Sequence, residues 1–129
     1  MTTNQRKTPN PVLKQIRAVS FDLDDTLWDC APVIMRAEEK LYSWFEQHHP
    51  QVIARRSRES MRELRANMYL THPHLAADVS MMRKALLQQL FDRHEDSEQL
   101  VEQAFSVFYT ARSEVELYDG THELSLIHI

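Results

Sequence analysis

Glycine is the residue that this sequence has least of, because Gly120 is the only one among 129 residues. Average usage near ~7% would give several. Glycine supplies the tight turns and positive-φ positions of the backbone, so such a low content excludes a turn-rich fold and favours a chain dominated by helices. It also indicates that the loops which bring backbone amides close to a bound phosphate are missing here.

Cysteine and long apolar runs are also scarce. Cys30 is the only cysteine, so no disulfide can form within the chain, and this suits a reducing cytoplasm. Nowhere do about 18 apolar residues follow one another, which predicts that no segment spans a membrane. No apolar stretch follows Arg6 and Lys7 near the N-terminus, so we expect no signal peptide and a cytoplasmic location.

An excess of basic residues is missing too. The chain has 15 lysines and arginines against 19 acidic residues, a formal net charge of -4 and a pI near 5.9. This balance predicts no nucleic acid and no anionic membrane as a partner. A small anionic substrate would therefore need a metal ion. Apolar residues make up 43% of the chain, which predicts one packed domain rather than disorder.

Two carboxylates follow the only convincing strand, which we predict at Ile16–Phe21. Residues i and i+2 point to the same side where a chain leaves a strand, so Asp22 and Asp24 form a pair and Asp25 points away. In an open α/β sheet, ligands bind beyond the carboxyl ends of the strands. A carboxylate there, helped by a divalent cation, can attack a phosphoryl group. We therefore predict Asp22 as nucleophile and Asp24 as proton shuttle.

Other kinds of site also use short acidic clusters. A calcium loop starting at Asp22 would need glycine at its sixth position and glutamate at its twelfth, but Leu27 and Val33 stand there. A solvated turn conflicts with the apolar residues on both sides of the cluster. The metal site of a sugar-nucleotide enzyme is a further alternative.

The segment from Phe21 to Leu27 resembles the first motif of the haloacid dehalogenase-like (HAD) hydrolases. The resemblance implies an α/β (Rossmannoid) parent fold, Asp22 as the phosphorylated nucleophile and Asp24 as general acid/base. It also implies Mg²⁺ as cofactor, held by the Asp22 carboxylate and the Asp24 backbone carbonyl. True dehalogenases of the family carry a non-acidic residue at the place of Asp24, so the acid here favours phosphate ester chemistry.

Apolar residues at helical spacing predict four amphipathic helices after this motif. The first helix is predicted between Pro32 and Pro50, and the second from a capping box at Ser60 to the break after Thr71. The third follows a cap at Asp78 and ends near His94, and the fourth starts at Asp96 and ends near Ser113. Four such segments favour an antiparallel bundle. The layout resembles the C1-type cap that HAD hydrolases carry after the first motif.

The predicted domain organisation follows from these segments. It comprises a flexible leader (1–11), the first strand and nucleophile motif (12–29), a helical cap (30–115), a return to the core by a turn and a helix (116–123) and a non-native tail (124–129). The tail resembles one reading frame of a transposon adapter used in sequencing libraries. The later family motifs, namely a Ser/Thr-ended strand, a downstream lysine and an acidic pair, are missing. We therefore expect a mostly α fragment of an α/β parent, with one core strand and a four-helix cap.

The expected function is that of the parent, a Mg²⁺-dependent phosphatase that hydrolyses a small phosphate monoester through an aspartyl-phosphate intermediate. This chain alone is expected to be inactive. Phe21–Asp29, the Pro73–Asp78 loop and the return at Tyr118–Gly120 most resemble flavin-mononucleotide or pyrimidine-nucleotide phosphatases, and the expected partner is a small phosphorylated metabolite. Two alternatives remain, a non-catalytic helical interaction module and a phosphomutase.

Overall fold

The computed structural model describes residues 15–127, with side chains to residue 124, and it consists of two compact units. We call Cys30–Glu116 the helical unit. The segments Met1–Asp29 and Leu117–Ile129 form the other, which we call the motif unit. The predicted leader 1–11 lies outside the described residues, as does the end of the predicted tail.

The helical unit contains all four predicted helices, so those predictions are confirmed. Its elements are α1 (Cys30–His48), α2 (Pro50–Ile53), α3 (Arg58–Thr71), the short 3₁₀ helix η2 (Pro73–Leu75), α4 (Val79–Phe91) and α5 (Ser97–Arg112). The sequence did not predict α2 or η2. Both begin at a proline, which suits the first turn of a helix because its missing N–H would have no partner there.

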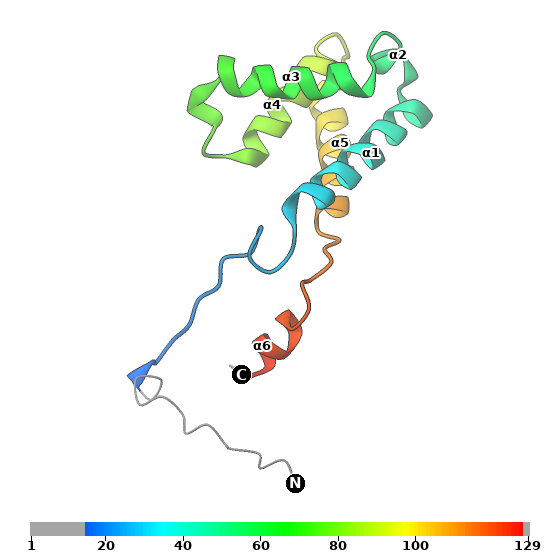
Figure 1. Ribbon diagram of the computed structural model, residues 1–129. Helices are drawn as coiled ribbons and strands as arrows, with labels where there is room; N and C mark the ends of the chain where they lie inside the picture. The colour runs from blue at the N-terminus through cyan, green and yellow to red at the C-terminus, as the bar shows by residue number, and fades with distance from the viewer. Residues whose placement is uncertain (1–14, 128–129) are drawn as a thin grey trace. The chain divides into compact units, whose positions relative to one another are not determined.

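The main core lies where α1 and α4 pack against α5. Figure 1 shows α5 running back alongside α1 in the opposite direction. The core is built from the apolar faces of these helices together with one residue of α2: Ala37, Leu41, Phe45, Ile53, Leu87, Phe91, Val101, Ala104, Phe108 and Ala111. A smaller cluster of Met68, Met82 and Leu86 joins α3 to α4. The predicted helical spacing therefore does bury one face of each of these helices.

The start of α3 differs from the prediction. Ser60 was expected to cap it, but Ser57 is the N-cap, and its Oγ accepts a hydrogen bond from the Ser60 backbone N–H at 3.1 Å. Ser57 has the extended backbone that an N-cap requires. The helix therefore begins at Arg58, directly after Ser57, and the Arg58 side chain pairs with Glu39 of α1. A capping pattern in the sequence cannot show this contact between helices.

Two aspartates precede helices but only one caps its helix. As predicted, Asp78 precedes α4, and its carboxylate accepts a hydrogen bond from the Met81 backbone N–H at 2.9 Å. Asp96 precedes α5, as predicted, but its side chain makes no capping hydrogen bond. The two aspartates therefore form a matched pair for measuring the value of the cap.

We expect Asp78→Ala to lower the free energy of unfolding by about 1 kcal/mol, because it removes the partner of an otherwise unpaired N–H. Asp96→Ala should cost less than half as much. Thermal denaturation followed by far-ultraviolet circular dichroism measures both. Equal losses in the two variants would contradict the assignment of the cap.

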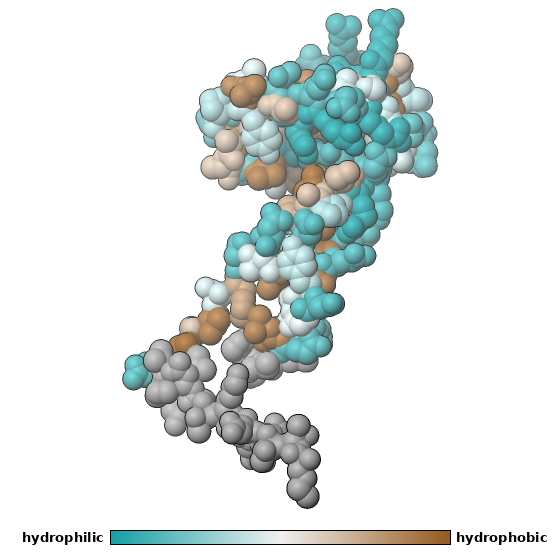
Figure 2. Space-filling view, viewed as in Figure 1, coloured by the Kyte–Doolittle hydropathy of each residue, from teal (hydrophilic) through white to brown (hydrophobic). Residues whose placement is uncertain are grey.

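In the motif unit, the predicted strand Ile16–Phe21 is not formed within the described residues, where only two isolated bridges, Asp24 with Trp28 and Trp28 with Leu117, are found. The physical reason is that a strand needs a neighbouring strand to pair with, and no strand is formed within residues 15–127. Apolar residues gather along the segment (Figure 2), and Ile16 is 49% exposed.

The return segment of the motif unit ends in α6 (Thr121–Ile127), which confirms the predicted turn and helix. Gly120 precedes α6 with a φ of 82°, a left-handed conformation that glycine adopts without strain. The single glycine therefore stands where the backbone requires one. None of the helices in residues 15–127 is long and apolar enough to cross a membrane.

Candidate active site

The two predicted catalytic carboxylates lie on a tight turn of the motif unit. Backbone N–H groups of Thr26 and Leu27 both donate to the Leu23 carbonyl, at 3.2 and 2.9 Å. Asp25 has a φ of 58°, in the left-handed region that aspartate and asparagine tolerate better than most residues. The chain therefore turns directly after Asp22.

Each carboxylate accepts a hydrogen bond from a residue four positions later. The Thr26 hydroxyl donates to Asp22 Oδ2 at 3.0 Å, and the Trp28 indole Nε1–H donates to Asp24 Oδ1 at 3.0 Å. Asp22 is exposed and Asp24 is half-buried. The turn thus presents an accessible carboxylate at Asp22 and holds the Asp24 carboxylate against an indole ring.

The return segment closes on the same turn, although it is distant in sequence. The Tyr118 backbone N–H donates to the Leu27 carbonyl at 2.8 Å, and the Thr121 hydroxyl donates to the same oxygen at 3.4 Å. Leu117 forms an antiparallel bridge with Trp28. The residues after the helical unit therefore hold the loop that carries Asp22 and Asp24.

The phenol of Tyr118 reports on this arrangement. Partial loss of water around the exposed ring, followed by the negative charges of Asp29 and Asp25, raises the pKa of Tyr118 above its ordinary value of 10.0. A raised folded-state pKa favours the protonated form, so this contribution to stability is complete below about pH 10 and is lost as the pH rises through the raised pKa.

We expect the tyrosinate absorbance that Tyr118→Phe removes to develop above pH 10.0 in the native chain. Asp29→Asn should shift that transition to lower pH, because it removes one of the charges that oppose ionisation. A spectrophotometric pH titration of the native chain and both variants measures this. A transition unchanged by Asp29→Asn would contradict the effect of the Asp29 charge on the pKa of Tyr118.

Asp22 and Asp24 offer oxygen ligands only, which fit Mg²⁺ better than zinc. Within residues 15–127, no group of three or more His, Cys, Asp or Glu side chains is placed to hold a metal ion. Mg²⁺ is commonly bound through one or two carboxylates with waters and substrate phosphate completing its shell, so the oxygen atoms of Asp22 and Asp24 fit part of such a site. The roles of Asp22 and Asp24 stay predictions.

Thr26, Trp28 and Tyr118 are site residues that the sequence motif did not predict. Thr26 and Trp28 carry a visible signal, because each is a hydrogen-bond donor four residues after a candidate carboxylate. No sequence signal shows where the Tyr118 backbone binds, because its contact with Leu27 joins segments on either side of the helical unit.

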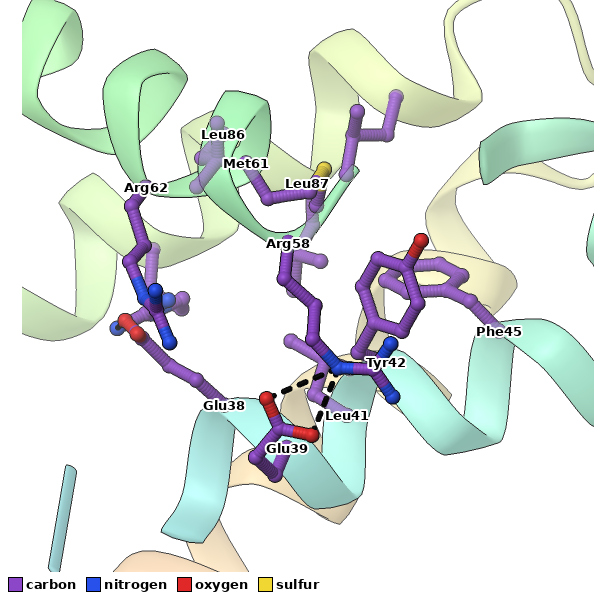
Figure 3. Close-up of a pocket in the computed structure, with 12 residues that line it drawn as sticks. Glu38, Glu39, Leu41, Tyr42, Phe45, Arg58, Met61, Arg62, Leu86 and Leu87 are labelled. Atoms are coloured by element: carbon purple, nitrogen blue, oxygen red, sulfur yellow. Dashed lines mark hydrogen bonds and ion pairs between the residues drawn. The ribbon is translucent and has the colours of Figure 1, made fainter. Parts of the chain in front are cut away.

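The helical unit has a cleft of its own beneath α3, drawn in Figure 3. Its floor is apolar and includes Leu41, Phe45 and Leu87. At its rim Arg58 Nε donates to both carboxylate oxygens of Glu39, at 3.0 and 2.8 Å. The guanidinium of Arg58 also lies over the Tyr42 ring, 4.2 Å from its centroid. The hydrogen-bonding groups of Arg58 and Glu39 are therefore paired with each other, and this part of the rim joins α1 to α3.

A second ionic cluster lies deeper in the same cleft. Glu38 accepts hydrogen bonds from Arg65 and from Arg83, the latter at 3.3 Å. Arg83 is only 8% exposed, and its guanidinium lies 3.9 Å from the centroid of the Phe108 ring. Burial lowers the pKa of Arg83, while the Glu38 carboxylate opposes that change. Glu38 is therefore the counter-ion of a buried positive charge.

Comparison with known proteins gives the family. No family model matches the chain. Over 115 residues it is 30% identical to the 5-amino-6-(5-phospho-D-ribitylamino)uracil phosphatase YigB of Escherichia coli (strain K12), covering 86% of this chain and 48% of that protein. The crystal structure of 2-haloacid dehalogenase from Pseudomonas syringae pv. tomato DC3000 matches with a TM-score of 0.69 and 28% identity. Both similarities support the resemblance of this chain to a fragment of a HAD-like hydrolase.

The HAD resemblance and its α/β parent fold are therefore confirmed. The chain spans about half the length of the curated relative it matches, and it covers 47% of the dehalogenase. The remaining half of each relative has no counterpart among these 129 residues. The missing strand before Asp22 within the described residues is consistent with this coverage, because an α/β fold needs further strands beside the first one.

Proposed function

We propose that this chain is the N-terminal part of a Mg²⁺-dependent phosphatase that hydrolyses a small phosphate monoester. The observation that carries the proposal is the exposed Asp22 carboxylate on a tight turn, two residues before a half-buried Asp24. The similarity to a phosphatase along most of the chain supports it. An acid at position 24, together with this similarity, favours phosphate esters over carbon–halogen bonds as substrates.

In the proposed reaction, an Asp22 carboxylate oxygen attacks the phosphorus atom of the ester. The bond from phosphorus to the ester oxygen breaks, and Asp24 gives its proton to the departing alkoxide. Asp24 then takes a proton from a water molecule, which attacks the aspartyl phosphate and releases inorganic phosphate. When bound, Mg²⁺ would neutralise the charge of the phosphate. The Asp22 carboxylate and the Asp24 backbone carbonyl would hold it.

The donors four residues after each aspartate have positioning roles in this proposal. Thr26 holds one oxygen of Asp22, so the other can face the phosphorus atom. The indole of Trp28 is a donor that keeps its proton, so it orients Asp24 without competing for the transferred proton. The return segment at Tyr118 stabilises the turn on which both aspartates stand.

The helical unit is proposed to be the cap that covers the reacting groups and selects the leaving group. Caps of this kind exclude water while the covalent intermediate forms. The name of the E. coli relative states a phosphorylated ribitylamino-uracil as its substrate. A phosphorylated metabolite of similar size is therefore the first substrate class to test, alongside flavin mononucleotide. The proposal includes a cytoplasmic location, supported by the lone Cys30.

The first experiment reads the source DNA through the codon for Glu123. A continuation that encodes a Ser/Thr-ended strand, a lysine and an acidic pair allows the extended protein to be made. We expect that protein to release inorganic phosphate from small phosphate monoesters with Mg²⁺ and not with a chelator. The 129-residue chain alone should be inactive.

Three other results would overturn the proposal. A stop codon directly after Ile129 would leave the non-catalytic helical module. An extended protein that shows no phosphate release would point to the same module. Return of the phosphoryl group to another position of a sugar, seen by product analysis, would show a phosphomutase.

A further inference from the structure

A second cleft of the helical unit lies between α2, the loop after it and the C-terminal end of α4, and it has a volume of about 550 Å³. Three arginines line it, namely Arg55 and Arg56 from the loop and Arg93 from the residues just after α4. All three are exposed. The volume lies within the roughly 300–1,000 Å³ that is typical of small-molecule sites.

These three arginines differ from those of the cleft beneath α3. There, Arg58 and Arg83 are paired with Glu39 and Glu38, and Arg62 is paired with Glu59. In contrast, the guanidinium groups of the three arginines of the second cleft form no hydrogen bond or ion pair with any residue in the described part of the chain. Their charge therefore remains available to a ligand.

The acidic groups at this cleft do not balance the arginines. Asp92 is the one acidic residue among those that line it within residues 15–127. The C-terminal end of α4 adds about half a negative charge. Three guanidinium groups therefore leave an excess of about 1.5 positive charges in the cleft. His94 also lines it, and its ring is held against the edge of Phe91, with the centroids 5.7 Å apart.

The chemistry of the walls indicates the kind of anion. Guanidinium groups bind phosphate oxygens through paired hydrogen bonds, and several together suit a ligand with more than one phosphate. Val52 and Leu90 give the cleft an apolar wall, and Gln51 and Gln89 add amide groups that can both donate and accept hydrogen bonds. Together these groups fit an organic molecule that carries a polyphosphate.

We propose that the cleft between α2 and the end of α4 binds a small organic polyphosphate, such as a nucleoside di- or triphosphate. Every residue that lines it belongs to the helical unit, whereas Asp22 and Asp24 belong to the motif unit. Three guanidinium groups suit a ligand with more than one phosphate, so we expect a ligand other than the phosphate monoester substrate proposed above.

The test uses the full 129-residue chain in a chelating buffer, so that no metal ion can recruit phosphate to the aspartates. Chemical shifts of the backbone amides and the arginine Nε–H groups are followed while ATP, ADP, AMP or inorganic tripolyphosphate is added. We expect saturable shifts at Arg55, Arg56 and Arg93. ATP should bind more tightly than tripolyphosphate, and AMP at least about tenfold more weakly than ATP, because it lacks the additional phosphates.

Charge-matched variants separate a specific site from general attraction. Arg93→Gln should weaken ATP binding about tenfold, since it removes a charge-assisted contact. Arg62→Gln removes the same charge from an exposed arginine that lines the other cleft, so it should change the affinity less than twofold. Because both side chains are exposed, neither variant should alter the thermal unfolding transition.

Several results would overturn the proposal. These are shifts that do not saturate at millimolar ATP, equal affinities for AMP and ATP, or equal losses in Arg93→Gln and Arg62→Gln. Shifts confined to the motif unit would likewise show that the anion binds elsewhere. None of these outcomes depends on turnover, so the test stands apart from the proposed phosphatase activity.

Discussion

A protein that carries this chain together with the remaining half of its relatives' length should lose at least about 10³-fold in turnover when Asp22 is changed to asparagine. The amide of asparagine is a poor nucleophile and lacks the charge that binds a metal ion. The turn itself should survive, because the amide oxygen can still accept the hydrogen bond from the Thr26 hydroxyl. Steady-state release of inorganic phosphate in Mg²⁺ measures the loss.

Asp25→Asn is the matched control for this prediction. It removes the same charge from the same turn at a position where the backbone has a φ of 58°. Asparagine tolerates this left-handed conformation, so the fold of the turn should be kept. We expect its turnover to stay within about tenfold of the native value. Substantial Mg²⁺-dependent turnover in Asp22→Asn would show that another group is the nucleophile.

Glu38→Ala should lower the free energy of unfolding by about 3 kcal/mol, because it leaves the buried Arg83 guanidinium without its carboxylate partner. The interaction of Arg83 with the Phe108 ring cannot replace a full negative charge. Arg65 loses its ion pair in the same variant. Thermal unfolding of the helices, followed by circular dichroism, should shift by on the order of 10 °C.

Glu39→Ala is the control, since Glu39 is the next residue of α1 and also binds an arginine. Its pair with Arg58 is exposed, with both side chains more than 40% accessible to solvent. Exposed pairs contribute between about 0 and 1 kcal/mol, so this variant should unfold near the native temperature. Equal destabilisation by the two variants would show that Arg83 does not depend on Glu38 for its charge balance.

The helices could be predicted from the sequence because their cause is local. Residues such as Leu41, Phe45 and Phe91 recur at the helical period, so the apolar face of each long helix can be read from the sequence. The start of α3 could not be predicted, because the pair between Arg58 and Glu39 joins two helices. The strand predicted before Asp22 depends on pairing with other strands, and only isolated bridges form within residues 15–127, so its sequence pattern alone could not establish it.

The candidate site shows the same division. A recognisable motif predicted Asp22 and Asp24, and the donors Thr26 and Trp28 follow from their spacing within that motif. The contact of Tyr118 with Leu27 could not be predicted, because the whole helical unit separates the two residues in the sequence. The arginines around the second cleft were hidden for another reason. A net charge of -4 describes the chain as a whole, whereas a cleft is defined by the few side chains that line it.

The indole of Trp28 gives the motif unit an intrinsic fluorophore in direct contact with Asp24. The chain has two tryptophans, and the other, Trp44, packs against Phe45 and His49 in the helical unit. Replacing Trp44 by phenylalanine therefore leaves one emitter beside the candidate catalytic pair. We expect its emission maximum and its quenching to change with the charge of the Asp24 carboxylate, so this fluorophore can test the proposed binding of metal and phosphate at the turn.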